Sequence, residues 1–130
     1  MNKIVVYSIV ESPGHPDFSR FYHERGWEEV RLDSMRKAIS QLRKQPPDLV
    51  VAEFFYGYGN NYAGINISNL DVFLHSLLKY APQARVIVMV EKAERPYVDK
   101  LAELFELASI LIQPVNEAKM QDALDKLAIK

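Results

Sequence analysis

Short apolar runs alternate along this chain with segments whose apolar residues recur every three or four positions. The runs are rich in β-branched residues, which is typical of strands, and they span residues 3–10, 27–32, 49–54, 85–90 and 109–112. The segments with helical spacing span residues 17–25, 35–45, 70–81, 95–107 and 117–127. The pattern therefore predicts five strands, each followed by a helix.

Capping and breaking residues indicate where these helices begin and end. Side chains that favour N-caps precede four of the helices: Asp17, Asp33 or Ser34, Ser68 or Asn69, and Asn116. Gly26 is expected to end the first helix, and Pro96 lies in the first turn of the fourth. The fourth helix is expected to bury one stripe, made of Val98, Leu101, Leu104, Phe105 and Ala108.

Strands that are apolar throughout require a sheet that is covered on both faces. Strands that alternate with helices then predict an α/β fold with a parallel sheet and right-handed crossovers. At 130 residues the chain is expected to form one domain, residues 1–130. The expected architecture is a doubly wound five-stranded parallel sheet of order 2-1-3-4-5, a flavodoxin-like three-layer sandwich.

Composition and charge narrow the classes of function. Apolar residues at 48% and charged residues at 25% are globular averages, and cysteine, with its disulfides and metal sites, is absent. The net charge of −1 argues against nucleic acid as the main partner. One region is basic, which we interpret as a solvated face: Arg31, Arg36, Lys37, Arg43 and Lys44. With no apolar run near the ~20 residues that span a bilayer and no secretory pattern at Met1, we expect a cytoplasmic protein without a membrane partner.

Two irregular segments, residues 11–16 and 55–67, follow the first and third strands. In the order 2-1-3-4-5 these strands are neighbours whose connections leave in opposite directions, which opens a crevice at their carboxyl ends. The segments should therefore converge there, either as a binding site or as a cover of the sheet edge. The candidate residues are His15, Asp17, Glu53, Tyr56, Tyr58, Asn60 and Tyr62.

Three stretches, Pro47 to Glu53, Arg85 to Val90 and Ile110 to Pro114, resemble the receiver (CheY-like) domains of response regulators. The resemblance covers essentially the whole chain and implies a signalling module, not an enzyme. In that family two acidic residues at the end of the first strand and an aspartate at the end of the third hold magnesium, and the aspartate accepts a phosphoryl group. Here the acceptor position is Glu53.

The other chemical positions of that family are replaced. The acidic pair falls on Tyr7, Ser8 or Ile9, the hydroxyl switch residue on Val90, and the lysine before proline on Gln113. Phosphoryl transfer needs a divalent cation among the reacting oxygens, and magnesium needs carboxylate ligands. We therefore expect a degenerate pseudo-receiver with no metal, no cofactor and no phosphorylation cycle, in which Glu53 is either a permanent charge or a structural carboxylate bonded to Gln113 and loop amides.

The first hypothesis for function is a phosphorylation-independent signalling module that acts through protein contacts. The resemblance also implies a homodimer through the fourth helix, fifth strand and fifth helix, with Tyr97 on that face. The alternative is a flavodoxin-like protein that binds a flavin or nucleotide in the crevice, with tyrosines stacked on a flat ring. Catalysis ranks third, because no nucleophile, base and orienting group occur together.

Overall fold

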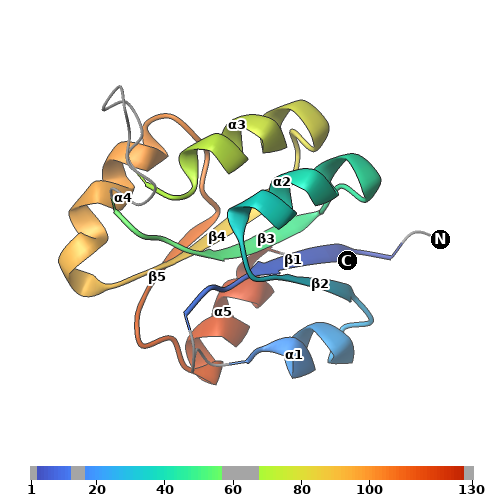
Figure 1. Ribbon diagram of the computed structural model, residues 1–130. Coiled ribbons are helices and arrows are strands. Elements are labelled where there is room, and N and C mark those ends of the chain that lie inside the picture. The colour runs from blue at the N-terminus through green and yellow to red at the C-terminus, as the bar shows by residue number, and fades with distance from the viewer. Residues whose placement is uncertain (1–2, 13–16, 57–67, 128–130) are drawn as a thin grey trace.

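The computed structural model describes residues 3–12, 17–56 and 68–127, which contain a five-stranded parallel sheet (Figure 1). Its order, β2-β1-β3-β4-β5, is the one that the sequence predicts. The strands are β1 (Val5–Ile9), β2 (Glu28–Leu32), β3 (Leu49–Glu53), β4 (Arg85–Val90) and β5 (Ser109–Ile112). β4 and β5 have the predicted bounds, and the other strands are shorter by one to three residues.

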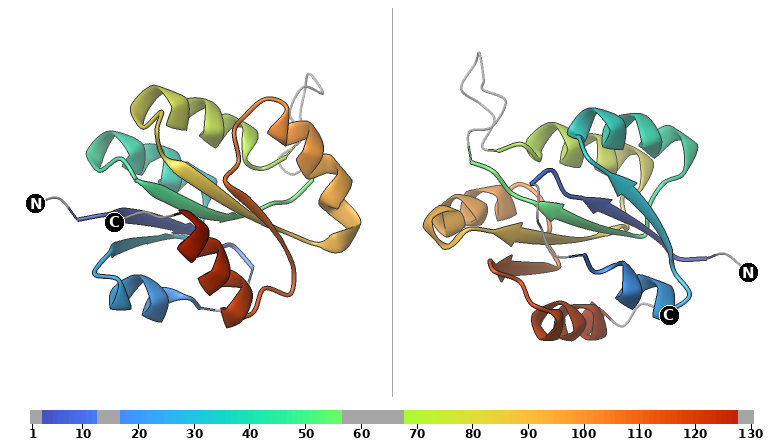
Figure 2. Two further views of the ribbon diagram at one scale, coloured as in Figure 1. Left: turned by 180° about the vertical axis from the view of Figure 1, so that it is seen from behind. Right: turned by 60° about the horizontal axis from the view of Figure 1, so that its bottom comes forward.

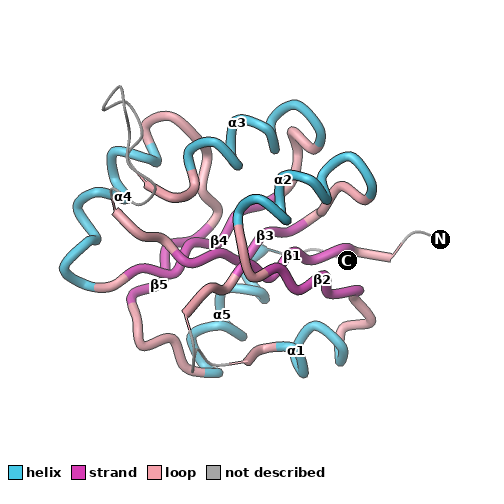
Figure 3. Tube along the Cα trace, viewed as in Figure 1, coloured by secondary structure: helices cyan, strands magenta, loops and turns pink. Residues whose placement is uncertain are grey.

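Helices cover both faces of this sheet, as Figures 1 and 2 show. The helices are α1 (Ser19–Glu24), α2 (Met35–Lys44), α3 (Asp71–Tyr80), α4 (Arg95–Ala102), which follows a 3₁₀ turn η1 (Lys92–Glu94), and α5 (Glu117–Leu127). α2, α3 and α4 lie on one face, and α1 and α5 lie on the other. The tube in Figure 3 shows the sheet as the middle of three layers. The predicted doubly wound sandwich is therefore confirmed.

Each face of the sheet has its own apolar core. Along β1, Tyr7 faces the core beneath α2, α3 and α4, while its neighbour Val6 faces the core above α1 and α5. Both residues are 0% exposed, because successive side chains of a strand point to opposite faces. Continuous apolar strands are thus a direct consequence of burial on two sides.

The predicted helix ends are partly right. Ser34 Oγ accepts the N–H of Lys37 at 3.2 Å, and Asn116 Oδ1 accepts the N–H of Lys119 at 2.8 Å, so both caps are confirmed. Gly26 ends α1 with a φ of 75°, which glycine adopts without steric cost. For α3 the prediction is wrong, because Leu70 occupies the N-cap position.

The fourth helix is shorter than predicted. α4 ends at Ala102, where hydrogen bonds tighten to a three-residue spacing, such as that from the Leu104 N–H to the Leu101 carbonyl at 3.0 Å. Val98 and Leu101 are fully buried as expected, but Leu104 is 59% exposed. The chain leaves the helix because Ala108 donates its N–H to the Val86 carbonyl at 2.7 Å and so enters the sheet.

Candidate functional site

The carboxylate of Glu53 lies at the carboxyl end of β3 and is only 2% exposed. Its Oε1 atom accepts two backbone hydrogen bonds from the segment after β1, from Glu11 N at 2.8 Å and from Ser12 N at 2.9 Å. Backbone amides carry positive partial charge at their hydrogens, so two of them stabilise a carboxylate that has lost its water. Glu53 therefore binds the β1–α1 connection to the end of β3.

A second carboxylate, that of Glu11, adjoins this position. Burial raises the pKa of Glu11, and the negative charges of Glu53 and Asp33 raise it further. The sequence places Glu11 beyond the end of the first strand, which ends at Ile9, and so gives it no role. The amides of Glu11 and Ser12 nevertheless contact Glu53, and the sequence carries no signal for that contact.

The two residues predicted at the switch positions, Val90 and Gln113, are joined through the backbone. Gln113 donates its N–H to the Val90 carbonyl at 2.8 Å, and the Gln113–Pro114 peptide bond is cis. The Val90 side chain is fully buried in the core on the α2, α3 and α4 face. An isopropyl group in that position has no polar atom with which to reach Glu53.

Asn69 closes the base of the β3–α3 connection. Its Nδ2 donates to the Glu53 carbonyl at 3.0 Å, and its Oδ1 accepts the N–H of Phe55 at 2.8 Å. An isolated antiparallel bridge between Tyr56 and Ser68 lies one residue further along. Sequence reasoning considered Asn69 only as a helix cap, and a polar residue just before an apolar helix carries no signal for this second role.

Tyr56 is the described member of the aromatic candidates in this connection. Its ring is 50% exposed and stacks on Tyr97 of α4, with centroids 3.6 Å apart and planes inclined by 18°. Its N–H donates to Glu94 Oε1 at 3.1 Å. Tyr58, Asn60 and Tyr62 lie in residues 57–67 and His15 in residues 13–16, which are outside the described residues.

Asp17 belongs to a polar cluster between α1 and β2. Its Oδ1 accepts the N–H of Ser19 at 2.8 Å and lies 3.2 Å from Arg31 Nη1. The hydrogen bonds from Ser19, with a smaller contribution from Arg31, hold the pKa of Asp17 below its ordinary value. The structure thus places Asp17 against α1 and β2 and Tyr56 against α4, whereas the sequence expected both on one surface.

The cavities that adjoin β1 at the carboxyl end of the strand are small. One of about 240 Å³ is lined by Ser8, Val10, Arg31, Leu32, Asp33 and Lys37, and one of about 20 Å³ shares Ser8, Val10 and Arg31 with it and reaches Tyr22. Small-molecule sites usually have volumes of about 300–1,000 Å³, so neither cavity favours a flavin or a nucleotide. Over residues 3–12, 17–56 and 68–127 no three His, Cys, Asp or Glu side chains form a group that could hold a metal ion.

Comparison with known proteins places the fold among receiver domains. No family model matches the chain, and no curated protein matches it. The non-phosphorylated HemR receiver domain of Leptospira biflexa matches with a TM-score of 0.74 at 12% identity, over 98% of this chain and 97% of that one. A receiver domain protein (CheY-like) of Methanospirillum hungatei JF-1 matches with a TM-score of 0.73 at 9% identity, over 97% and 94%.

A third match is a protein described as an adenylate cyclase from Rhodopirellula baltica, with a TM-score of 0.67 at 10% identity over 96% of this chain and 87% of that one. Identities this low show only a shared fold. The chain therefore has the CheY-like receiver fold, and its function has to be inferred from its own residues. None of the described helices has the length and apolar character needed to cross a membrane.

Proposed function

We propose that this protein is a receiver-like signalling or regulatory module that acts through protein–protein contacts and without phosphorylation. One observation carries the proposal: Glu53, at the acceptor position, has its Oε1 atom bonded to the amides of Glu11 and Ser12. An oxygen that holds two amide hydrogens is a structural acceptor and a weakened nucleophile.

Electrostatics at this position also oppose phosphorylation. A phosphoryl group adds about 1.5–2 negative charges at neutral pH. Glu11 already has a raised pKa, in part because of the charge on Glu53, and an added phosphoryl group would increase that repulsion. In the family a lysine helps to balance such a charge, and its position here is Gln113, which carries no positive charge. At this position an added phosphoryl group therefore meets repulsion from Glu11.

The partner surface that we propose includes the Tyr56–Tyr97 stack and the segment that follows Tyr56. Exposed aromatic rings held by neighbours are enriched in protein interfaces, because they bury much area and lose little rotamer entropy. Tyr58, Asn60, Tyr62 and His15 remain predicted members of this surface, whereas Asp17 lies apart from Tyr56, against α1 and β2. A second copy of the chain, docked through α4, β5 and α5, is one partner to test, by sedimentation analysis of the purified protein.

The first experiment addresses phosphorylation. The protein is incubated with acetyl phosphate and Mg²⁺, and its intact mass is measured. We expect no added phosphoryl group. A mass gain that the Glu53→Gln variant abolishes would contradict the proposal.

The second experiment addresses the partner. Affinity capture from the native cell is compared for the wild type, Glu53→Gln and Tyr56→Ala, with Tyr80→Ala as a control, since Tyr80 bonds Arg43 on α2, away from this edge. We expect Glu53→Gln and Tyr80→Ala to retain the partner and Tyr56→Ala to lose most of it. Equal capture by all four proteins would exclude the Tyr56 surface.

A further inference from the structure

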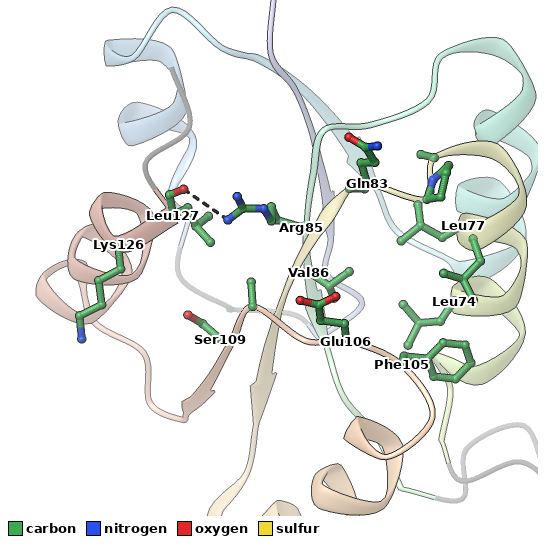
Figure 4. Close-up of a pocket in the computed structure, with 15 residues that line it drawn as sticks. Leu74, Leu77, Gln83, Arg85, Val86, Phe105, Glu106, Ser109, Lys126 and Leu127 are labelled. Carbon is green, nitrogen blue, oxygen red and sulfur yellow. Dashed lines mark hydrogen bonds between the residues drawn. The ribbon is translucent and has the colours of Figure 1, made fainter.

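A cavity of about 620 Å³ lies at the amino ends of β4 and β5, at the opposite end of the strands from Glu53 (Figure 4). It lies between α3, the segment that follows α4, and the end of α5. Its volume is within the range of about 300–1,000 Å³ that small-molecule sites occupy. It shares no lining residue with the cavities near Glu53, so it is a separate site.

One wall of this cavity is apolar. It is formed by Leu74, Leu77 and Leu78 of α3 together with Val86 and Phe105. Figure 4 shows Leu74, Leu77 and Phe105 beside α3. Leu78 is 52% exposed, a large value for a leucine in a hollow. The wall exists because α4 ends at Ala102, so that Phe105 packs edge-on against His75 with centroids 4.9 Å apart and no helix covers the space beside it.

The opposite wall is polar and carries an excess of positive charge. Arg85 and Lys126 line it together with Ser109, and Glu106 is the one carboxylate among the residues that line the cavity. Lys126 pairs with Asp122 one turn away on α5, at 3.1 Å. Arg85 donates Nη1 to the Leu127 carbonyl at 3.3 Å and forms no ion pair with any described residue. Figure 4 shows its side chain extending toward Leu127 at the end of α5.

We propose that this cavity binds a small amphipathic organic anion, with its apolar body against Leu74, Leu77 and Phe105 and its acidic group at Arg85. A guanidinium offers two parallel N–H donors that match a carboxylate. Removal of apolar ligand surface from water contributes about 25 cal/mol per Å². A cation of the same shape would meet the positive charges of Arg85 and Lys126, and a neutral one would offer Arg85 no negative charge. This inference does not rest on the proposed protein-contact function.

The first test uses probes of matched shape and different charge on the full chain. 8-Anilinonaphthalene-1-sulfonate is titrated by fluorescence, and decanoate, decanol and decyltrimethylammonium are added as competitors. We expect one saturable class of site, displacement by decanoate at least about tenfold more effective than by decyltrimethylammonium, and a rise in Tm with decanoate by mass action. Equal displacement by the cation and the anion would overturn the proposal.

The second test uses paired variants. Arg85→Gln is expected to weaken dye and decanoate binding about tenfold, whereas Arg36→Gln, which removes the same charge from an exposed site on α2, should leave both unchanged. Leu78→Ser should weaken binding, while Leu104→Ser, equally exposed but outside the lining, should not. If Arg85→Gln fails to fold, Lys126→Gln replaces it. The site would be contradicted if Leu78→Ser bound the probes with wild-type affinity and folded Arg85→Gln or Lys126→Gln did so too.

Discussion

Glu53 Oε1 accepts the backbone N–H of Glu11 at 2.8 Å, although the two residues are 42 positions apart. This hydrogen bond gives the Glu53 carboxylate a donor and holds Glu11 next to it. The pKa of Glu11 rises through burial and through the charge on Glu53. The carboxylate at the predicted acceptor position is therefore engaged in an internal contact, whose energy can be measured in several ways.

Replacement of Glu53 tests the contact directly. In Glu53→Ala the amides of Glu11 and Ser12 lose their acceptor, and we expect the free energy of unfolding to fall by about 2–4 kcal/mol. Glu53→Gln retains a side-chain oxygen and should lose about 1 kcal/mol. Urea denaturation of both variants measures the difference. Equal stability of the two would show that these hydrogen bonds contribute nothing.

The acidic pair also predicts a dependence of stability on pH. Because the pKa of Glu11 is above its ordinary value of 4.5 in the folded state, the folded protein binds this proton more tightly than the unfolded chain. The contribution of Glu11 to stability is therefore full below pH 4.5 and is lost as the pH rises through the folded-state pKa. Glu11→Gln should be more stable than the wild type at pH 7, by less than about 1 kcal/mol because solvent screens this part-exposed group.

Urea denaturation at pH 7 and pH 4 measures this effect, with Glu103→Gln, at an exposed site, as the matched control. We expect the gain of Glu11→Gln to shrink at pH 4 and Glu103→Gln to show no gain at either pH. A loss of stability in Glu11→Gln at pH 7 would contradict the proposed repulsion.

Asn69 is expected to need both its side-chain oxygen, as an acceptor, and its side-chain nitrogen, as a donor. In Asn69→Asp one carboxylate oxygen still accepts the Phe55 N–H, but the atom that faces the Glu53 carbonyl can no longer donate. We expect a loss of about 2–4 kcal/mol at pH 7 that is partly recovered at pH 4, where the protonated acid donates again. Asn116→Asp is the control, because a helix cap needs only an acceptor. Similar losses in the two variants would refute this role.

The Tyr56–Tyr97 stack predicts a coupling between the β3–α3 connection and α4. A double-mutant cycle of Tyr56→Ala and Tyr97→Ala, followed by urea denaturation, should give a coupling energy of about 0.5–1.5 kcal/mol. Tyr97→Phe retains the ring and should retain most of the coupling. If the losses in the free energy of unfolding of the two single variants add up in the double variant, the stacked rings do not stabilise each other.

Local pattern was sufficient for most of the fold. β4 and β5 have the predicted bounds because buried parallel strands must be apolar on both faces, and Ser34 and Asn116 cap helices through contacts with residues three positions away. Contacts of this kind lie within one segment, so the sequence carries them directly. The end of α4 was mispredicted because the pull of Ala108 into the sheet comes from Val86 on another strand.

The sequence by itself determined the α/β class and the strand order, since each follows from residue types and their spacing. Only the tertiary structure decided which groups meet: Glu11 beside Glu53, Asn69 across the base of its connection, Tyr56 on Tyr97, and Arg85 in one cavity lining with Leu74 and Phe105. The physical reason is that hydrogen bonds, stacking and charge act over a few ångströms in space, whichever distance separates the residues along the chain.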